Sequence, residues 1–329
     1  MKKISVFLLI VTILLVTVAC KKDDRIQIGI LQFLSHEDLD QAREGFVEAL
    51  EEAGFIDGDN IKITVLNPQA DALTMQTQAA QLVRNSDLIL AIATPAAVAV
   101  VNEAKDKGVN IPILFTAVTD PVDAGLVPKL LKPGGNVTGT SDMNPIEEQM
   151  SLVKRIKPDA TTVGILYTSS ETNSQVQADL AETELTRLGL NTEIGTISSL
   201  QDLPHVFAQL VSKVDVIYIP SDNLLASSMG AVEVELKKAA ADGKSVPIIT
   251  TTISQVENGG TLTFGLSYFN LGKQTGEMAV KVLNGENIGE ISVETILNTQ
   301  LIINKKQIEE VLNMVVPADL LEEAEIILE

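Results

Sequence analysis

The 329-residue sequence contains no tryptophan, one cysteine and two histidines, and aromatic residues make up only 3% of it. A single cysteine cannot form a disulfide within the chain, and together with two histidines it supplies too few ligands for a zinc site. Lysine and arginine number 24 against 44 aspartates and glutamates, which gives a net charge of -20. Nucleic-acid binding depends on clustered cationic side chains, so this composition excludes nucleic acid as a partner. We also expect no metal site.

Residues 1–19 have the layout of a signal peptide, in which two lysines precede an apolar run over 4–18. That run is too short to cross about 30 Å of hydrocarbon comfortably. Cys20 follows a small alanine and precedes polar residues, which resembles a bacterial lipobox, although Thr17 stands where leucine is usual. We expect Cys20 to receive lipid as the first residue of the mature chain, with 20–25 as its tether. An uncleaved membrane anchor is the alternative.

An internal repeat dominates the rest of the chain. Residues 28–31 match 163–166 and residues 108–113 match 243–248, each time 135 positions apart. In both copies, short runs of Ile, Val and Leu alternate with amphipathic helical periodicity, a pattern typical of parallel sheets covered by helices. The sequence therefore predicts an α/β fold of two doubly wound, Rossmann-like lobes.

The expected strands of the first copy are 26–33, 61–66, 88–92 and 111–116, and those of the second are 163–167, 193–197, 216–219 and 246–250. Residues 132–142, rich in glycine, are the best linker candidate. Beyond the second copy we expect a strand over 261–267, a helix over 271–283 and extended structure over 292–303, which return to the first lobe and cross back. The predicted lobes are 26–141 plus about 268–298 and 142–267 plus about 299–329, joined by a multi-crossover hinge.

Motifs that bind cofactors or perform catalysis are missing. Gly29 in the first strand is followed by Ile30 and Leu31, so no G-x-G-x-x-G loop is present for a dinucleotide. No G-x-S-x-G motif occurs, and we expect neither His36 nor His205 to lie near a nucleophilic serine in a hydrolase triad. These absences favour a binding protein without a cofactor over an enzyme.

Ligands of open α/β sheets bind beyond the carboxyl ends of the strands. In this sequence those ends are rich in uncharged hydrogen-bonding residues, and they include Gln32, Ser35, Thr94, Pro95, Thr116, Asp120, Tyr167, Ser221, Asp222 and Asn223. Helix capping is the alternative role, because Ser35 precedes Asp38 as in a capping box and Thr94 precedes Pro95 as a cap. The two roles can coexist.

No lysine or arginine occurs at these turns, so a zwitterion suits the site better than a phosphorylated anion. Its carboxylate would lie at the N-terminus of the helix that starts at Pro95. Asp222 is the first choice of partner for its ammonium group, and Asp142 is the second. Tyr167 and Tyr268 are near strand ends and crossovers, where they could together form a wall for a flat apolar side chain. A plain core role is the alternative for each of them.

Three segments carry a resemblance to a known family: Ala-Thr-Pro-Ala-Ala at 93–97, Phe-Thr-Ala-Val-Thr-Asp-Pro at 115–121 and Pro-Ser-Asp-Asn at 220–223. With the lipobox and the duplicated lobes, the chain resembles the ABC-transporter substrate-binding lipoproteins of the type I periplasmic-binding-protein fold, in the group that binds aromatic amino acids, tryptophan especially. The resemblance implies a cleft formed by Thr94, Ala96, Ala97, Thr116, Ser141, Asp142, Ser221, Asp222 and Asn223.

The resemblance also implies partners and a location. Members of the family deliver their ligand to a membrane permease driven by an ATPase, and their lobes close on the ligand. A lipid on Cys20 would hold the protein at the outer face of the cytoplasmic membrane, as in Gram-positive cells. Other ligands stay open at this point: branched-chain amino acids, sugars and purine nucleosides are bound by receptors of the same fold.

Overall fold

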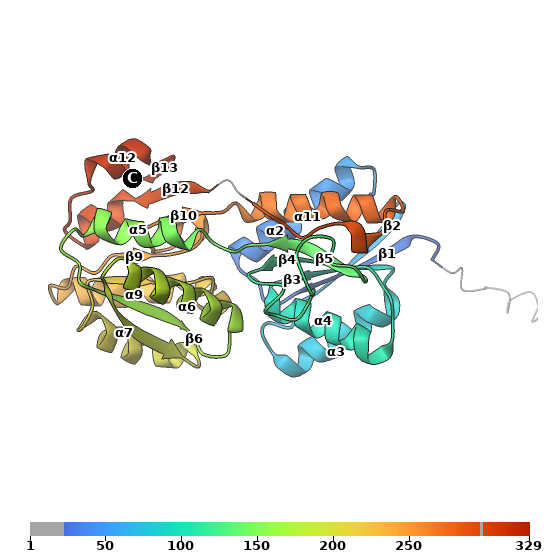
Figure 1. Ribbon diagram of the computed structural model, residues 1–329, viewed down its shortest axis with the longest axis horizontal. Helices are drawn as coiled ribbons and strands as arrows, with labels where there is room; N and C mark the ends of the chain where they lie inside the picture. The colour runs from blue at the N-terminus through green and yellow to red at the C-terminus, as the bar shows by residue number, and fades with distance from the viewer. Residues whose placement is uncertain (1–22, 297–298) are drawn as a thin grey trace, which may run out of the picture.

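The computed structural model describes residues 23–296 and 299–329, which form two α/β lobes lying side by side (Figure 1). The predicted signal peptide and Cys20 lie outside the described residues. Within the described part of the chain, no helix is both long and apolar enough to cross a membrane.

The first lobe is built on a six-stranded parallel sheet with the order β11-β5-β4-β3-β1-β2. Its strands are β1 (Ile26–Gln32), β2 (Ile61–Leu66), β3 (Leu88–Ile92), β4 (Ile113–Val118), β5 (Val137–Ser141) and β11 (Glu294–Thr295), and its helices are α2 (Glu37–Glu52), α3 (Ala72–Asn85), α4 (Thr94–Lys107) and α11 (Tyr268–Leu283). Every residue of β3, β4 and β5 is buried. The central strands are covered on both faces, which explains the mainly apolar sequences of β3 and β4.

The second lobe contains a seven-stranded sheet with the order β13-β12-β10-β9-β8-β6-β7. Its strands are β6 (Thr162–Thr168), β7 (Asn191–Ile197), β8 (Val216–Tyr218), β9 (Ile248–Ile249), β10 (Leu262–Gly265), β12 (Gln300–Asn304) and β13 (Ile326–Leu328). Its α-helices are α5 (Ile146–Ile156), α6 (Thr172–Arg187), α7 (Leu203–Val211), α8 (Asn223–Ala226), α9 (Met229–Ala241), α10 (Ile253–Glu257) and α12 (Ala318–Glu323). Strand β12 runs antiparallel to β10 and parallel to β13.

The two sheets share one topology. In the first lobe the order β2-β1-β3-β4-β5 follows the same path as β7-β6-β8-β9-β10 in the second. This confirms the repeat and the predicted fold class. One detail was wrong: the segment 132–142, expected to be a linker, contains β5, which pairs with β4 through Ile113 and Val137. Its small and β-branched residues fit a buried strand.

Helix α11 follows the second copy in sequence, yet it packs lengthwise against α2 of the first lobe (Figure 1). Glycines allow this close contact. A Cβ atom at Gly276 would lie 2.6 Å from the Cβ of Ala49, and one at Gly45 would lie 2.8 Å from the backbone nitrogen of Lys273. Lys273 also pairs with Glu48 and Glu52, each at 2.8 Å. Helix α11 is therefore an integral part of the first lobe, although it follows most of the second lobe in sequence.

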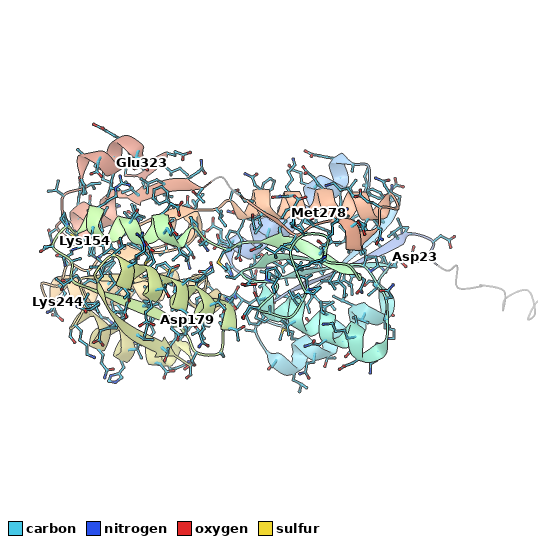
Figure 2. All side chains as sticks on the ribbon, viewed as in Figure 1. Asp23, Lys154, Asp179, Lys244, Met278 and Glu323 are labelled. Carbon is cyan, nitrogen blue, oxygen red and sulfur yellow. The ribbon has the colours of Figure 1, made fainter. Side chains whose placement is uncertain are left out.

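The chain passes between the lobes several times. It leaves the first sheet after Ser141 and returns between β10 and α11; β11 then joins the first sheet and β12 the second. Figure 2 shows the side chains on this framework: Lys154, Asp179, Lys244 and Glu323 are exposed, whereas Met278 is buried in the first lobe. The crossings of the chain between the lobes form a hinge, about which the two lobes can open and close.

Candidate ligand-binding site

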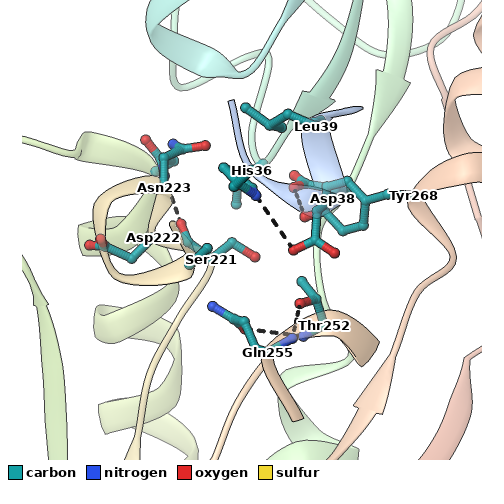
Figure 3. A pocket seen from close by; sticks show the side chains of 14 residues that line it. His36, Asp38, Leu39, Ser221, Asp222, Asn223, Thr252, Gln255 and Tyr268 are labelled. Carbon is teal, nitrogen blue, oxygen red and sulfur yellow. Dashed lines mark hydrogen bonds and ion pairs between the residues drawn. The ribbon is translucent and has the colours of Figure 1, made fainter. Parts of the chain in front are cut away.

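A cavity lies between the lobes. Its lining consists of His36, Asp38, Leu39, Ala117, Thr119, Asp142, Asn173, Ser221, Asp222, Asn223, Ala226, Thr252, Gln255 and Tyr268. Figure 3 shows side chains of both lobes converging on it. No lysine or arginine is among these lining residues. The cavity therefore favours a ligand with a positively charged group.

Asp142 and Tyr268 form one pole of the cavity. They lie on separate crossovers, Asp142 directly after β5 and Tyr268 at the start of α11. The Tyr268 hydroxyl donates a hydrogen bond of 2.6 Å to Oδ2 of Asp142, while Oδ1 of Asp142 is buried without a partner. Burial raises the pKa of Asp142, and the hydrogen bonds from Tyr268 and Thr119 oppose that shift. A ligand cation would satisfy the unpaired oxygen.

A second buried carboxylate, Asp38 in the first turn of α2, lies at the same pole. The Ser254 hydroxyl from the second lobe donates to Oδ1 of Asp38 at 2.6 Å. Oδ2 of Asp38 lies 3.9 Å from Nδ1 of His36. Burial raises the pKa of Asp38 to about 6. A site with two partly compensated carboxylates attracts an ammonium group strongly.

Gln255 supplies a donor at the floor of the cavity. Its Oε1 accepts hydrogen bonds from the backbone nitrogens of Thr251 and Thr252 and from the Thr251 hydroxyl. These bonds fix the orientation of the amide, so its Nε2 is the free end, buried and without a partner. An anionic oxygen of a ligand would accept from Nε2.

The predicted first choice of ammonium partner, Asp222, is occupied by capping. Its carboxylate accepts from the backbone nitrogens of Thr168 and Leu225, at 2.6 and 2.9 Å, and from the Thr168 hydroxyl. Its carboxylate also points away from the middle of the cavity (Figure 3). Nearby, buried Glu171 accepts from the backbone nitrogens of Asn223 and Leu224. The structure thus favours the second choice, Asp142.

Five of the predicted site residues line the cavity: Asp142, Ser221, Asp222, Asn223 and Tyr268. The lining does not include Gln32, Ser35, Thr94, Pro95, Ala96, Ala97, Thr116, Asp120, Ser141 or Tyr167. Several of these have internal partners instead. Gln32 bonds to Asp40, and Thr116 bonds to Thr140 within the first lobe.

Both predicted helix caps were displaced by one or more positions. Helix α2 begins after His36, and Ser35 donates to Asp40 rather than forming a capping box with Asp38. Helix α4 begins after Ala93, so Thr94 lies inside the helix, and its hydroxyl is buried without a partner. No residue of α4 lines the cavity, so the predicted placement of a ligand carboxylate at that helix is not supported.

The sequence analysis did not predict Asp38, Asn173 or Gln255 as ligand-binding residues. They lie in the first turns of α2, α6 and α10. Each occurs one to five residues beyond a predicted strand end or turn, and Asp38 was considered only as a partner of Ser35 in a capping box. What the three residues share is a position in the first turn of a helix that starts at the cleft. A polar residue at such a position is the feature of the sequence that could have identified them. Among the described residues, no group of histidine, cysteine and acidic side chains could hold a metal ion.

The comparison with family models gives the class of this protein: residues 27–327 match the ABC transporter substrate binding protein family, and the chain belongs to it. Members of this family are binding proteins, not enzymes. The expected recognition, including the absence of catalysis, is confirmed.

Two individual relatives have names that include an amino acid. The chain is 43% identical over 279 residues to a tyrosine-binding protein of Clostridioides difficile, covering 84% of this chain and 78% of the relative. A crystal structure from Streptococcus pneumoniae in complex with L-Trp is 36% identical, with a TM-score of 0.85, and the match covers 92% of this chain and all of that one.

A third relative is similar in sequence but less similar in structure. The ligand-free, open structure of a substrate-binding protein with adhesive properties from Clostridium difficile is 40% identical, and the match covers 92% of this chain and 99% of that one, but its TM-score is only 0.69. The L-Trp complex, at lower identity, fits better. In this structure Ser254 of the second lobe donates a hydrogen bond to Asp38 of the first, so the lobes touch across the cleft, and we call this arrangement closed.

Proposed function

We propose that this protein captures an aromatic amino acid, with tryptophan and tyrosine as the first candidates, and delivers it to an ABC importer. The observation that carries the proposal is the unpaired Oδ1 of Asp142, buried in a cavity lined by no cationic side chain. An α-ammonium group neutralises that oxygen and contributes donors to it. Two of the relatives described above, by their names, bind tyrosine or contain L-Trp, which supports the same class of ligand.

The remaining unpaired groups fit the other atoms of an amino acid. The ammonium group would lie between Asp142 and Asp38, and the α-carboxylate would accept from Nε2 of Gln255. Leu39, Ala117 and Ala226 supply apolar surface for the side chain. Tyr268, held by its bond to Asp142, completes the wall.

The transport partners and the location belong to the same proposal. A permease and an ATPase would receive the ligand, and lipid on Cys20 would hold the protein at the outer face of the cytoplasmic membrane of a Gram-positive cell. The sequence pattern around Cys20 supports this anchoring. Cys20→Ala should release the protein from the membrane fraction without changing its ligand affinity. A Cys20→Ala protein that stays in the membrane fraction would contradict a lipid anchor.

A thermal-shift screen of the twenty amino acids tests the ligand class. A ligand at about 100 times its dissociation constant stabilises the folded protein by about 2.7 kcal/mol. We expect tryptophan or tyrosine to raise the melting temperature and Asp142→Asn to abolish the rise. A larger rise with a sugar or a purine nucleoside in the same assay would contradict an amino acid ligand. It would indicate that the protein is a receptor for that other class of ligand.

A further inference from the structure

Two further residues that line the cavity, His36 and Asn173, carry polar atoms without partners. Nε2 of His36 and Oδ1 of Asn173 are both buried and accept no hydrogen bond from any described residue. His36 comes from the loop before α2, and Asn173 comes from the first turn of α6, so the two lobes each contribute one atom. In Figure 3, His36 lies between Asn223 and Ser221 on one side and Asp38 on the other.

The chemistry of both atoms is fixed by their neighbours. The amide nitrogen of Asn173 donates to the backbone oxygen of Ser221 at 2.7 Å and to Glu171 at 3.2 Å, so its Oδ1 is the end left over. Burial lowers the pKa of His36 to about 4, and its ring is therefore neutral near pH 7. Nδ1 lies 3.9 Å from the carboxylate of Asp38, which is too far for a hydrogen bond. The negative charge of that carboxylate favours the tautomer with its proton on Nδ1, and in this tautomer Nε2 is an acceptor.

Two buried acceptors in one cavity call for a donor. We infer that His36 and Asn173 select a ligand whose side chain carries an N–H or O–H group, such as the phenol of tyrosine or the indole of tryptophan, over the hydrocarbon ring of phenylalanine. The inference rests on the proposed function, because it takes the α-ammonium group to be bound at Asp142. An apolar ring against these residues leaves both acceptors desolvated and unpaired, which is the costly arrangement for buried polar groups.

Selection of this kind differs from shape selection. A pocket that recognises ring size alone discriminates weakly between tyrosine and phenylalanine, whereas one that supplies a hydrogen-bond partner rejects the analogue that lacks it. His36 is thus a specificity-determining residue, acting on the side chain of the ligand, while Asp142 and Gln255 act on its α-ammonium and α-carboxylate groups.

Titration calorimetry with L-tyrosine, L-tryptophan and L-phenylalanine tests the inference. We expect the wild-type protein to bind tyrosine or tryptophan roughly 10- to 100-fold more tightly than phenylalanine, the ratio that corresponds to one buried hydrogen bond. His36→Phe keeps a ring of similar size and should remove this preference, while phenylalanine binding stays the same or improves. His36→Gln, which retains an acceptor, should restore part of the preference.

Equal wild-type affinities for all three amino acids would overturn the inference and leave the proposed function standing. Equal losses for all three ligands in His36→Phe, with an unchanged melting temperature, would also overturn it, because His36 would then have no role in selection. If the wild-type protein binds none of the three, the proposed function itself fails. The comparison of wild-type affinities needs no variant, so it decides even if a substitution prevents folding.

Discussion

The hydroxyl of Ser254 donates a 2.6 Å hydrogen bond to Oδ1 of Asp38, linking a helix of the second lobe to a helix of the first. Beside it, the side chain of Asn258 donates to Glu37 at 3.2 Å. The residues of each pair are more than 200 positions apart in sequence and come from different lobes. The contact exists when the lobes are closed and is lost when they separate, so it contributes directly to closure.

Ser254→Ala should therefore weaken ligand binding without changing the cavity wall. The substitution leaves the buried carboxylate of Asp38 without this donor in the closed form, at a cost of about 1 to 3 kcal/mol. In the open form water replaces the donor. We expect ligand affinity to fall roughly 5- to 150-fold, measured by titration calorimetry, with faster dissociation. Ser151→Ala, which removes an exposed hydroxyl in α5, is the matched control, and an equal effect of both variants would contradict a closing role.

Asp142→Asn should abolish the attraction for the ammonium group while keeping the size of the side chain. Truncating one partner of a desolvated charge pair costs about 2 to 5 kcal/mol, so affinity should fall roughly 30-fold or more. Asp222→Asn should behave differently. Its carboxylate accepts three hydrogen bonds within the second lobe, and we expect the melting temperature of the ligand-free protein to fall instead.

Differential melting and calorimetry on these two variants separate the two carboxylates. Should Asp222→Asn lose affinity with an unchanged melting temperature, Asp222 rather than Asp142 would hold the ammonium group, as the sequence alone suggested.

Gln255→Glu tests the binding of the α-carboxylate. The substitution keeps an oxygen that can accept from Thr251 and Thr252, and it replaces the free Nε2 with a second oxygen. An anionic side chain at that point repels the carboxylate of a ligand, so we expect a loss of affinity of at least tenfold, or about 1.4 kcal/mol. Binding of an amine that lacks the carboxylate, such as tyramine, should be retained or improved. Parallel losses for tyrosine and tyramine would place the carboxylate elsewhere.

Ligand affinity should fall as the solution becomes more acidic. Burial raises the pKa of Asp38 to about 6, and Glu37, Glu257, His36 and Asp142 are its titratable neighbours. An ammonium ligand prefers the ionised carboxylate, whereas protonation of Asp38 below about pH 6 stabilises the empty closed form. Between about pH 7.5 and about pH 5 we expect a loss of roughly tenfold. Calorimetry across this range checks it, and Asp38→Asn should flatten the profile.

The framework of both lobes was predictable because its signals are local. Apolar runs such as 61–66 and 88–92 matched β2 and β3 residue for residue, and the repeat predicted that the second lobe would copy the first. Helix α11 was expected to return to the first lobe, but its backbone contact with α2 was not. That contact depends on Gly45, which lies against Phe269 and Lys273 of α11, and on Gly276, which lies against Phe46 and Ala49 of α2. Neither glycine has a local signal for it.

The site was predictable only in part. Strand ends and the family resemblance identified Asp142, Ser221 and Tyr268, since the carboxyl edge of a parallel sheet brings such residues together. The orientation of Asp222 was not predictable, because a carboxylate at a helix start can either cap the helix or face a ligand, and the sequence is the same in both cases. Which buried atoms remain without partners is a property of the folded packing.

Titration of the wild-type mature chain with L-tyrosine and L-tryptophan is the most direct test of the central claim, that the cavity between the lobes binds an aromatic amino acid. The account predicts saturable binding of one molecule per chain, competed by the other aromatic amino acid, and lost in Asp142→Asn. Absence of measurable heat and of any thermal stabilisation with every aromatic amino acid, under conditions where the chain is folded, would contradict it.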